Sequence, residues 1–171
     1  YLKKYGDIEI NHETKEEIIK NTKALMLHKI GSTVVKSTDN ILISKLIGIV
    51  EVGIYSNYYL ITNAFVTIIN QIFNAVLASV GNLGATETNK KKLQVFNAIN
   101  FMNFLIYSFV TGGLLILFNP FISVWVGKDF LFGMPVVISI CVNFYLTGMR
   151  RTVIIFRDAL GLYWYDRYKA I

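Results

Sequence analysis

The chain has 171 residues, of which 54% are hydrophobic and only 16% are charged, and its mean hydropathy is +0.48. This composition is too apolar for an ordinary soluble domain unless the apolar residues are gathered in membrane spans. They are gathered in this way, because four long apolar stretches are separated by short polar segments. Composition therefore excludes a globular soluble enzyme. It predicts an all-α integral membrane bundle, since the period-2 alternation of a membrane barrel is absent.

The charge balance and the cysteine content limit the kinds of partner and metal site that the chain can have. A net charge of +6 would suit a nucleic-acid-binding protein, but on a membrane chain the position of the basic residues matters more, and we expect no nucleic acid. The single Cys141 excludes an intramolecular disulfide and a thiol metal cluster. Because the chain begins at Tyr1 rather than Met, we expect it to be a piece of a longer protein.

In chain order, residues 1–23 carry charges of both signs and predict a cytoplasmic or interfacial segment that leads into the membrane, although residues 1–12 also suit a solvated linker. Four transmembrane spans are expected within residues 24–156, at about 24–48, 54–80, 93–118 and 134–156. Asn119 and Pro120 are expected to end the third span, while Pro135 suits the first turn of the fourth. Residues 157–171, rich in Trp and Tyr, predict a second cytoplasmic interfacial segment.

The basic residues predict the orientation of these spans. With a cytoplasmic N-terminus, the segments on the inside hold nearly all the Lys and Arg residues, and the outer loops keep only Lys128. Lys90, Lys91, Lys92, Arg150 and Arg151 are therefore topology markers first. The prediction is a multi-pass membrane protein with both ends of the chain in the cytoplasm.

The first span has an unusual feature, because Lys36 and Asp39 lie near its middle. A helix over 24–48 is roughly 37 Å long, against a hydrocarbon core of about 30 Å. A charged residue at the centre of a span costs about 2.5–3.5 kcal/mol, so it usually faces a protein interior or a watery cavity. The two residues either serve a substrate pathway or neutralise one another at i, i+3 as a structural pair.

Every predicted span also has a stripe of polar residues at helical spacing. Such a stripe either binds neighbouring helices by hydrogen bonds or lines a hydrated pathway. Four stripes together with an ionisable pair favour the pathway. The predicted substrate-binding residues are Lys36, Asp39, Asn40, Asn63, Asn70, Asn74, Tyr107, Asn143 and Arg150.

The sequence lacks the signatures of the other chemistries. It has no phosphate-binding glycine loop and no HExxH motif, and His12 and His28 lie apart near the predicted cytoplasmic edge. Ser79 is not in a G-x-S-x-G elbow. We therefore expect no catalytic residue, metal or cofactor, and a protein that is not an enzyme.

Several segments resemble one family of membrane proteins. The runs KIGSTVVKSTDNILIS (29–44), VGIYSNYY (52–59), SVGNL (79–83), NPFISVWVGKDF (119–130) and FRDALGLY (156–163) are similar to the bacterial polysaccharide-biosynthesis flippases. These belong to the multidrug/oligosaccharidyl-lipid/polysaccharide exporter superfamily. The resemblance implies a transporter of about 12 to 14 helices in two lobes, of which this chain would be part of the second lobe.

The resemblance further implies alternating access and a lipid-linked substrate. Such transporters move undecaprenyl-pyrophosphate-linked oligosaccharide repeat units across the plasma membrane for export of surface polysaccharide. The implied partners are that substrate, the membrane lipids and the remainder of the transporter chain. Lys36 is the residue expected to meet the pyrophosphate, as a compact cation. The alternatives are a multidrug or small-cation antiporter, a membrane enzyme of glycan assembly, and a structural membrane subunit.

Overall fold

The computed structural model describes residues 12–46 and 48–162, except for the side chains at positions 12–14, 17, 28, 32, 35–37, 39–40 and 84–85. All regular structure in this part of the chain is helical. The described residues fall into two compact units, 12–38 with 161–162, and 39–160. The prediction of an all-α chain is confirmed.

The first helix, α1, runs from His12 to Leu46 and extends from the first unit into the second. Within the first unit, threonine hydroxyls on this helix donate to backbone carbonyls one turn earlier, as from Thr22 to Ile18 at 2.7 Å and from Thr33 to Lys29 at 2.9 Å. Gly48 separates α1 from the next helix with φ at 148°, a conformation that favours glycine. Its N–H donates to the carbonyl of Ile43 at 3.0 Å.

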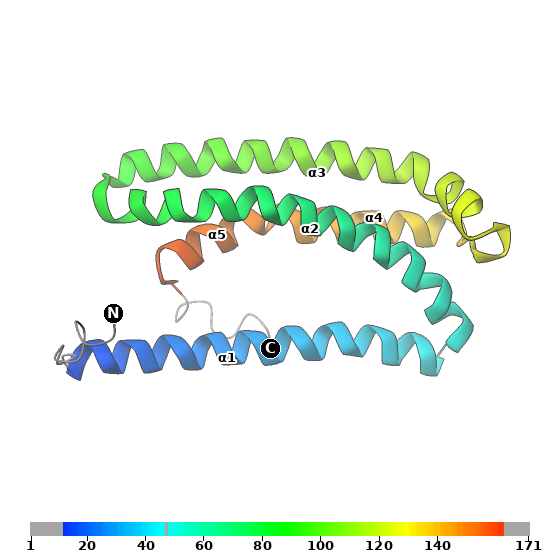
Figure 1. Cartoon of the computed structure of the whole chain (residues 1–171), viewed down its shortest axis with the longest axis horizontal. Helices are drawn as coiled ribbons and strands as arrows, with labels where there is room; N and C mark the ends of the chain where they lie inside the picture. The colour runs from blue at the N-terminus through cyan, green and yellow to red at the C-terminus, as the bar shows by residue number, and fades with distance from the viewer. Residues whose placement is uncertain (1–11, 47, 163–171) are drawn as a thin grey trace, which may run out of the picture. The chain divides into compact units, whose positions relative to one another are not determined.

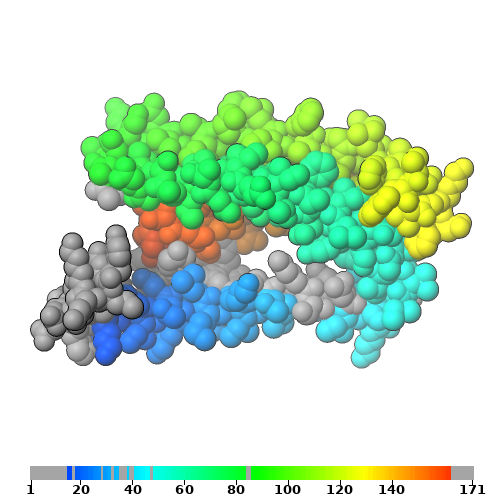
Figure 2. Space-filling model, viewed as in Figure 1, coloured from blue at the N-terminus to red at the C-terminus, as the bar shows by residue number. Residues whose placement is uncertain are grey.

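Two long helices dominate the second unit. α2 spans Ile49–Thr86 and α3 spans Asn89–Trp125, and they lie side by side in opposite directions (Figure 1). The link between them is only Glu87 and Thr88, both extended, after which Lys92 donates to the Thr88 carbonyl at 3.0 Å. A connection this short forces antiparallel neighbours. In the space-filling view, the two helices form one face of this unit (Figure 2).

The expectation that Asn119 and Pro120 end the third helix is wrong, because α3 continues through Pro120 to Trp125. Proline removes one helical hydrogen bond, but neighbouring contacts can hold the helix together. Here the Asn119 side chain is fixed to Tyr58 and Phe132, and Ile122, one turn later, is fully buried. These contacts offset the missing bond.

The predicted fourth helix is divided in two. After a short 3₁₀ turn, η2 (Lys128–Phe130), α4 runs from Met134 to Met149 with Pro135 in its first turn, as predicted, and α5 runs from Arg151 to Ala159. The break falls at Arg150. The Asn103 amide of α3 bonds there to the carbonyls of Gly148 and Met149, and a side chain inserted into a helical ladder is a known cause of a break.

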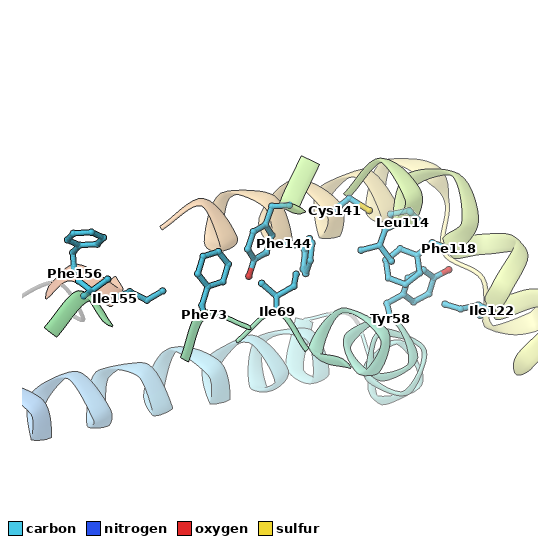
Figure 3. Close-up of a cluster of buried hydrophobic side chains, with 13 residues drawn as sticks. Tyr58, Ile69, Phe73, Leu114, Phe118, Ile122, Cys141, Phe144, Ile155 and Phe156 are labelled. Atoms are coloured by element: carbon cyan, nitrogen blue, oxygen red, sulfur yellow. The ribbon is translucent and has the colours of Figure 1, made fainter. Parts of the chain in front are cut away.

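The core of the second unit lies where α2, α3, α4 and α5 meet. Tyr58, Ile69 and Phe73 of α2 point toward side chains of the other helices, among them Cys141 and Phe144 of α4 (Figure 3). Among the described residues, only α2 (Ile49–Leu83) and α3 are long and apolar enough to cross a membrane. α4, with 16 residues, is shorter than a typical span of about 20 residues, so the four-span topology stays a prediction.

Candidate functional site at the junction of α4 and α5

An arginine meets polar groups from two other helices at the start of α5. The Arg151 guanidinium donates from Nη2 to Asn74 Oδ1 of α2 at 2.8 Å. Arg151 is half-buried and lies close enough to Tyr107 of α3 to interact with it electrostatically. α5 packs mainly on α2 and also on α3, which explains how residues 77 positions apart come together.

A buried asparagine completes this cluster from α3. Asn103 is fully buried, and its Nδ2 donates to the Gly148 carbonyl at 3.1 Å and to the Met149 carbonyl at 3.4 Å. These carbonyls belong to the last turn of α4, where backbone acceptors lack helical partners. Asn103 therefore caps α4 from the side and holds the junction against α3.

Three buried polar atoms at this junction have no hydrogen-bond partner among the described residues: Asn103 Oδ1, Arg151 Nε and Thr152 Oγ1. Thr152 is itself fully buried. The hydroxyl of Thr111 is also unpartnered, but it lies eight residues beyond Asn103, or about 12 Å along α3. We refer to Asn74, Asn103, Tyr107, Arg151 and Thr152 as the junction cluster.

Tyr107 contacts α4 by close packing of its ring rather than by a hydrogen bond. It is only 2% exposed, and its ring centroid is 5.2 Å from that of Phe144. A Cβ placed on Gly148 would overlap the Tyr107 ring, so only glycine fits at this position of α4. The close approach of α3 and α4 at the junction depends on this glycine.

The predicted site residues are only partly brought together. Asn74, Tyr107 and the backbone next to Arg150 meet at the junction, and the Arg150 side chain is exposed. Asn63 and Asn143 are exposed on α2 and α4, and Asn70 is half-buried. Asn143 accepts a bond from Thr147 at 3.3 Å, within its own helix. Lys36, Asp39 and Asn40 are on α1, but their side chains lie outside the described part, so their roles stay predictions.

Sequence reasoning missed Asn103 and Thr152 and treated Arg151 only as a topology marker. A signal for Asn103 was present, because it is three residues after Asn100 and four before Tyr107, on the predicted polar face. No comparable signal existed for Arg151 or Thr152. Their positions depend on the break at Arg150, which the sequence pattern does not predict.

At the other end of these helices, a second polar group is fully paired. The Tyr58 hydroxyl donates to Asn119 Oδ1 at 2.6 Å and accepts from the Phe132 N–H at 2.9 Å, while Asn119 Nδ2 donates to the Phe132 carbonyl at 3.1 Å. Tyr58 is fully buried and packs on the ring of Phe118 at 4.9 Å (Figure 3). This closed network, the Tyr58 latch, joins α2, α3 and the segment before α4.

Neither the groove between α2 and α3 nor the metal-binding residue types form a polar site in the described part of the chain. An open groove of about 250 Å³ between α2 and α3 is lined by apolar side chains, including Phe73, Val76 and Ile99. Within the described ranges, no three His, Cys, Asp or Glu side chains are placed to hold a metal ion. The junction cluster is therefore the candidate site.

Comparison with known proteins supplies the family. No curated protein and no solved structure gives a significant match to the chain. A family model described as polysaccharide biosynthesis protein matches residues 3–135, most of the chain, including Asn74, Asn103 and Tyr107 but not Arg151 or Thr152. Together with two helices of membrane-spanning length, this match indicates a membrane protein. The chain belongs to this family of polysaccharide biosynthesis proteins.

Proposed function

We propose that the chain is part of a transporter that flips undecaprenyl-pyrophosphate-linked oligosaccharide repeat units across a bacterial plasma membrane by alternating access. It acts without enzymatic chemistry, and its partners are the lipid-linked substrate, the surrounding lipids and the rest of the transporter. The family and the apolar helices support a role in surface polysaccharide assembly at a membrane. The finer steps, flipping and the lipid-linked substrate, are the proposal.

The observation that carries the proposal is the environment of Arg151. Arg151 is half-buried, its guanidinium bonds to the exposed and neutral Asn74, and no carboxylate pairs with it among the described residues. A cation that is partly withdrawn from water without a counter-charge is stabilised when an anion joins it. A guanidinium presents planar, paired donors that match phosphate oxygens, so a pyrophosphate is the kind of anion that suits it.

The other predicted residues keep the roles expected from the sequence. Lys36 stays the residue expected to meet the pyrophosphate, and Asp39 its balancing carboxylate in the absence of substrate. The exposed amides of Asn63 and Asn143 offer hydrogen bonds that suit sugar hydroxyls without requiring one particular sugar. A cytoplasmic face at the junction end agrees with the basic residues there, Lys90 to Lys92 and Arg150.

The second candidate, an antiporter of organic or small cations, is less well supported. Such a transporter would place acidic side chains in the substrate path, whereas the junction cluster has a cation and neutral amides. A membrane enzyme of glycan assembly would need a polar catalytic loop. The loop between α3 and α4 is short and holds only one charged pair of neighbours, Lys128 and Asp129.

The test is a transport assay with the full-length protein reconstituted in vesicles. A pyrophosphate-linked oligosaccharide placed in one leaflet should become accessible from the other at least tenfold faster than in protein-free vesicles. A fluorescent organic cation should cross at the protein-free rate. Movement of the organic cation but not of the oligosaccharide would overturn the proposal in favour of the antiporter.

A further inference from the structure

The junction cluster contains buried polar atoms that have no hydrogen-bond partner among the described residues. Asn103 and Thr152 are both fully buried, yet Asn103 Oδ1 and Thr152 Oγ1 have no hydrogen-bond partner in the part of the chain that the structure describes. Buried polar groups in proteins are almost always bonded to protein or to ordered water. Two such groups near one helix break therefore point to a ligand at that place.

Backbone contacts place Asn103 and Thr152 at the same helix end. Asn103 Nδ2 is fixed by the carbonyls of Gly148 and Met149, which orients the amide at the end of α4. Thr152 follows Met149 by three residues, about one helical turn, on the buried face of α5 that also carries Ile155. Arg151 lies between them in the chain, and its Nε is buried and unpartnered as well.

The free groups select the ligand by their chemistry. Asn103 Oδ1 needs a donor, Arg151 Nε needs an acceptor, and the Thr152 hydroxyl can act as either. A hydroxyl satisfies all three requirements, because it donates one proton and accepts two bonds. A phosphate oxygen would be repelled by the Asn103 carbonyl oxygen, and a metal cation would be repelled by the guanidinium.

We propose that the junction of α4 and α5 binds a small neutral hydroxyl ligand, either an ordered water or a hydroxyl of a sugar, between Asn103, Arg151 and Thr152. Water is the usual occupant of such a place, since buried waters typically make about three hydrogen bonds to otherwise unpaired groups. The proposal does not depend on pyrophosphate binding, because a hydroxyl would occupy the junction in any transporter or structural subunit with this fold.

Thermal unfolding of the full chain in detergent gives the first test, with Thr152→Val. If the hydroxyl has a ligand, this nearly isosteric change removes a hydrogen bond and should lower the apparent Tm by roughly 2–5 °C. The matched control is Thr67→Val, because the Thr67 hydroxyl is exposed and donates to the Asn63 carbonyl of its own helix. That variant should hold or raise the Tm. A Tm for Thr152→Val equal to or above that of Thr67→Val would overturn the proposal.

Cysteine labelling in membranes is an independent second test and identifies the source of the hydroxyl. In a Cys141→Ala background, Thr152→Cys should react with 2-aminoethyl methanethiosulfonate at least tenfold faster than Ile155→Cys, which is equally buried one turn later. Equal rates would exclude a sugar hydroxyl as the ligand, because a site that the substrate enters is also open to the reagent. Slower labelling of Thr152→Cys when a pyrophosphate-linked oligosaccharide is added assigns the ligand as a sugar hydroxyl, and an unchanged rate assigns it as water.

Discussion

At the scale of single residues, a shift of one position separates an exposed side chain from one that joins two helices. Arg150 and Arg151 are neighbours, yet the Arg150 side chain is exposed, whereas Arg151 turns inward and bonds to Asn74. Sequence reasoning placed Arg150 in the site and Arg151 among the topology markers. Periodicity cannot separate the two, because the break in the helix changes the direction of every side chain that follows it.

Gly148 shows how a residue without a side chain can determine this arrangement. A Cβ there would overlap the Tyr107 ring, so Gly148→Ala should force α3 and α4 apart and lower the free energy of unfolding by about 1–3 kcal/mol. Thermal unfolding in detergent measures the change.

Gly113→Ala is the control for this substitution, because nothing lies within 4 Å of a Cβ at Gly113. This variant should be neutral or slightly stabilising, since alanine favours a helix by about 1 kcal/mol over glycine. Equal effects of the two substitutions would contradict the close contact. Combining Gly148→Ala with Tyr107→Leu should recover part of the lost stability, because the smaller side chain makes room for the Cβ.

At the scale of helices, the structure extends one predicted helix and divides another. Asn119 and Pro120 are predicted to end the third helix, but α3 continues to Trp125, because the Tyr58 latch and the burial of Ile122 outweigh the bond lost at Pro120. The fourth expected helix breaks at Arg150, because the Asn103 amide donates hydrogen bonds to the carbonyls of Gly148 and Met149. Both deviations come from side chains on other helices, which local sequence patterns do not contain.

The Tyr58 latch leads to a prediction at this scale. Tyr58→Phe removes the hydroxyl and leaves both Asn119 Oδ1 and the Phe132 N–H without their partner. Both contacts are partly buried, and an unpaired group costs up to about 1–3 kcal/mol when it is shielded from water, so the apparent Tm should fall by a few degrees.

The neighbouring Tyr59→Phe is the control for the latch, because Tyr59 is 45% exposed and its hydroxyl makes no hydrogen bond among the described contacts. Its Tm should stay within about 1 °C of the unchanged protein. If Tyr58→Phe were as harmless as Tyr59→Phe, the latch would not hold α2, α3 and the start of α4 together.

At the scale of the whole molecule, the sequence predicted the class of protein better than the site. The apolar stretches and the sequence motifs indicated a helical membrane protein of polysaccharide assembly. The match to a polysaccharide biosynthesis family model confirms this family. The site could be predicted only in part. Asn74 and Tyr107 follow from helical spacing, but their meeting with Arg151 depends on how α5 packs against α2. The periodicity of a sequence indicates which residues share one face of a helix, but it does not indicate which other helix packs against that face.

The two ends of the helices in the second unit differ in how well their polar groups are paired. The Tyr58 latch is closed, with every described donor and acceptor of Tyr58 and Asn119 engaged, whereas the junction cluster keeps three buried atoms without partners. Fully paired networks rigidify a fold, whereas a buried polar group without a partner is rare in a native structure. This contrast supports the proposal that the end that carries Arg151 is the binding end.

The central claim is that Arg151 meets the anionic group of the substrate, and export of surface polysaccharide by cells that carry the full-length protein tests it most directly. Arg151→Gln keeps a hydrogen bond to Asn74 possible but removes the positive charge, so export should fall at least tenfold with normal membrane insertion. Arg157→Gln makes the same change at a residue paired with Asp158, and export should stay within twofold of the unchanged protein. Normal export with Arg151→Gln would contradict the account.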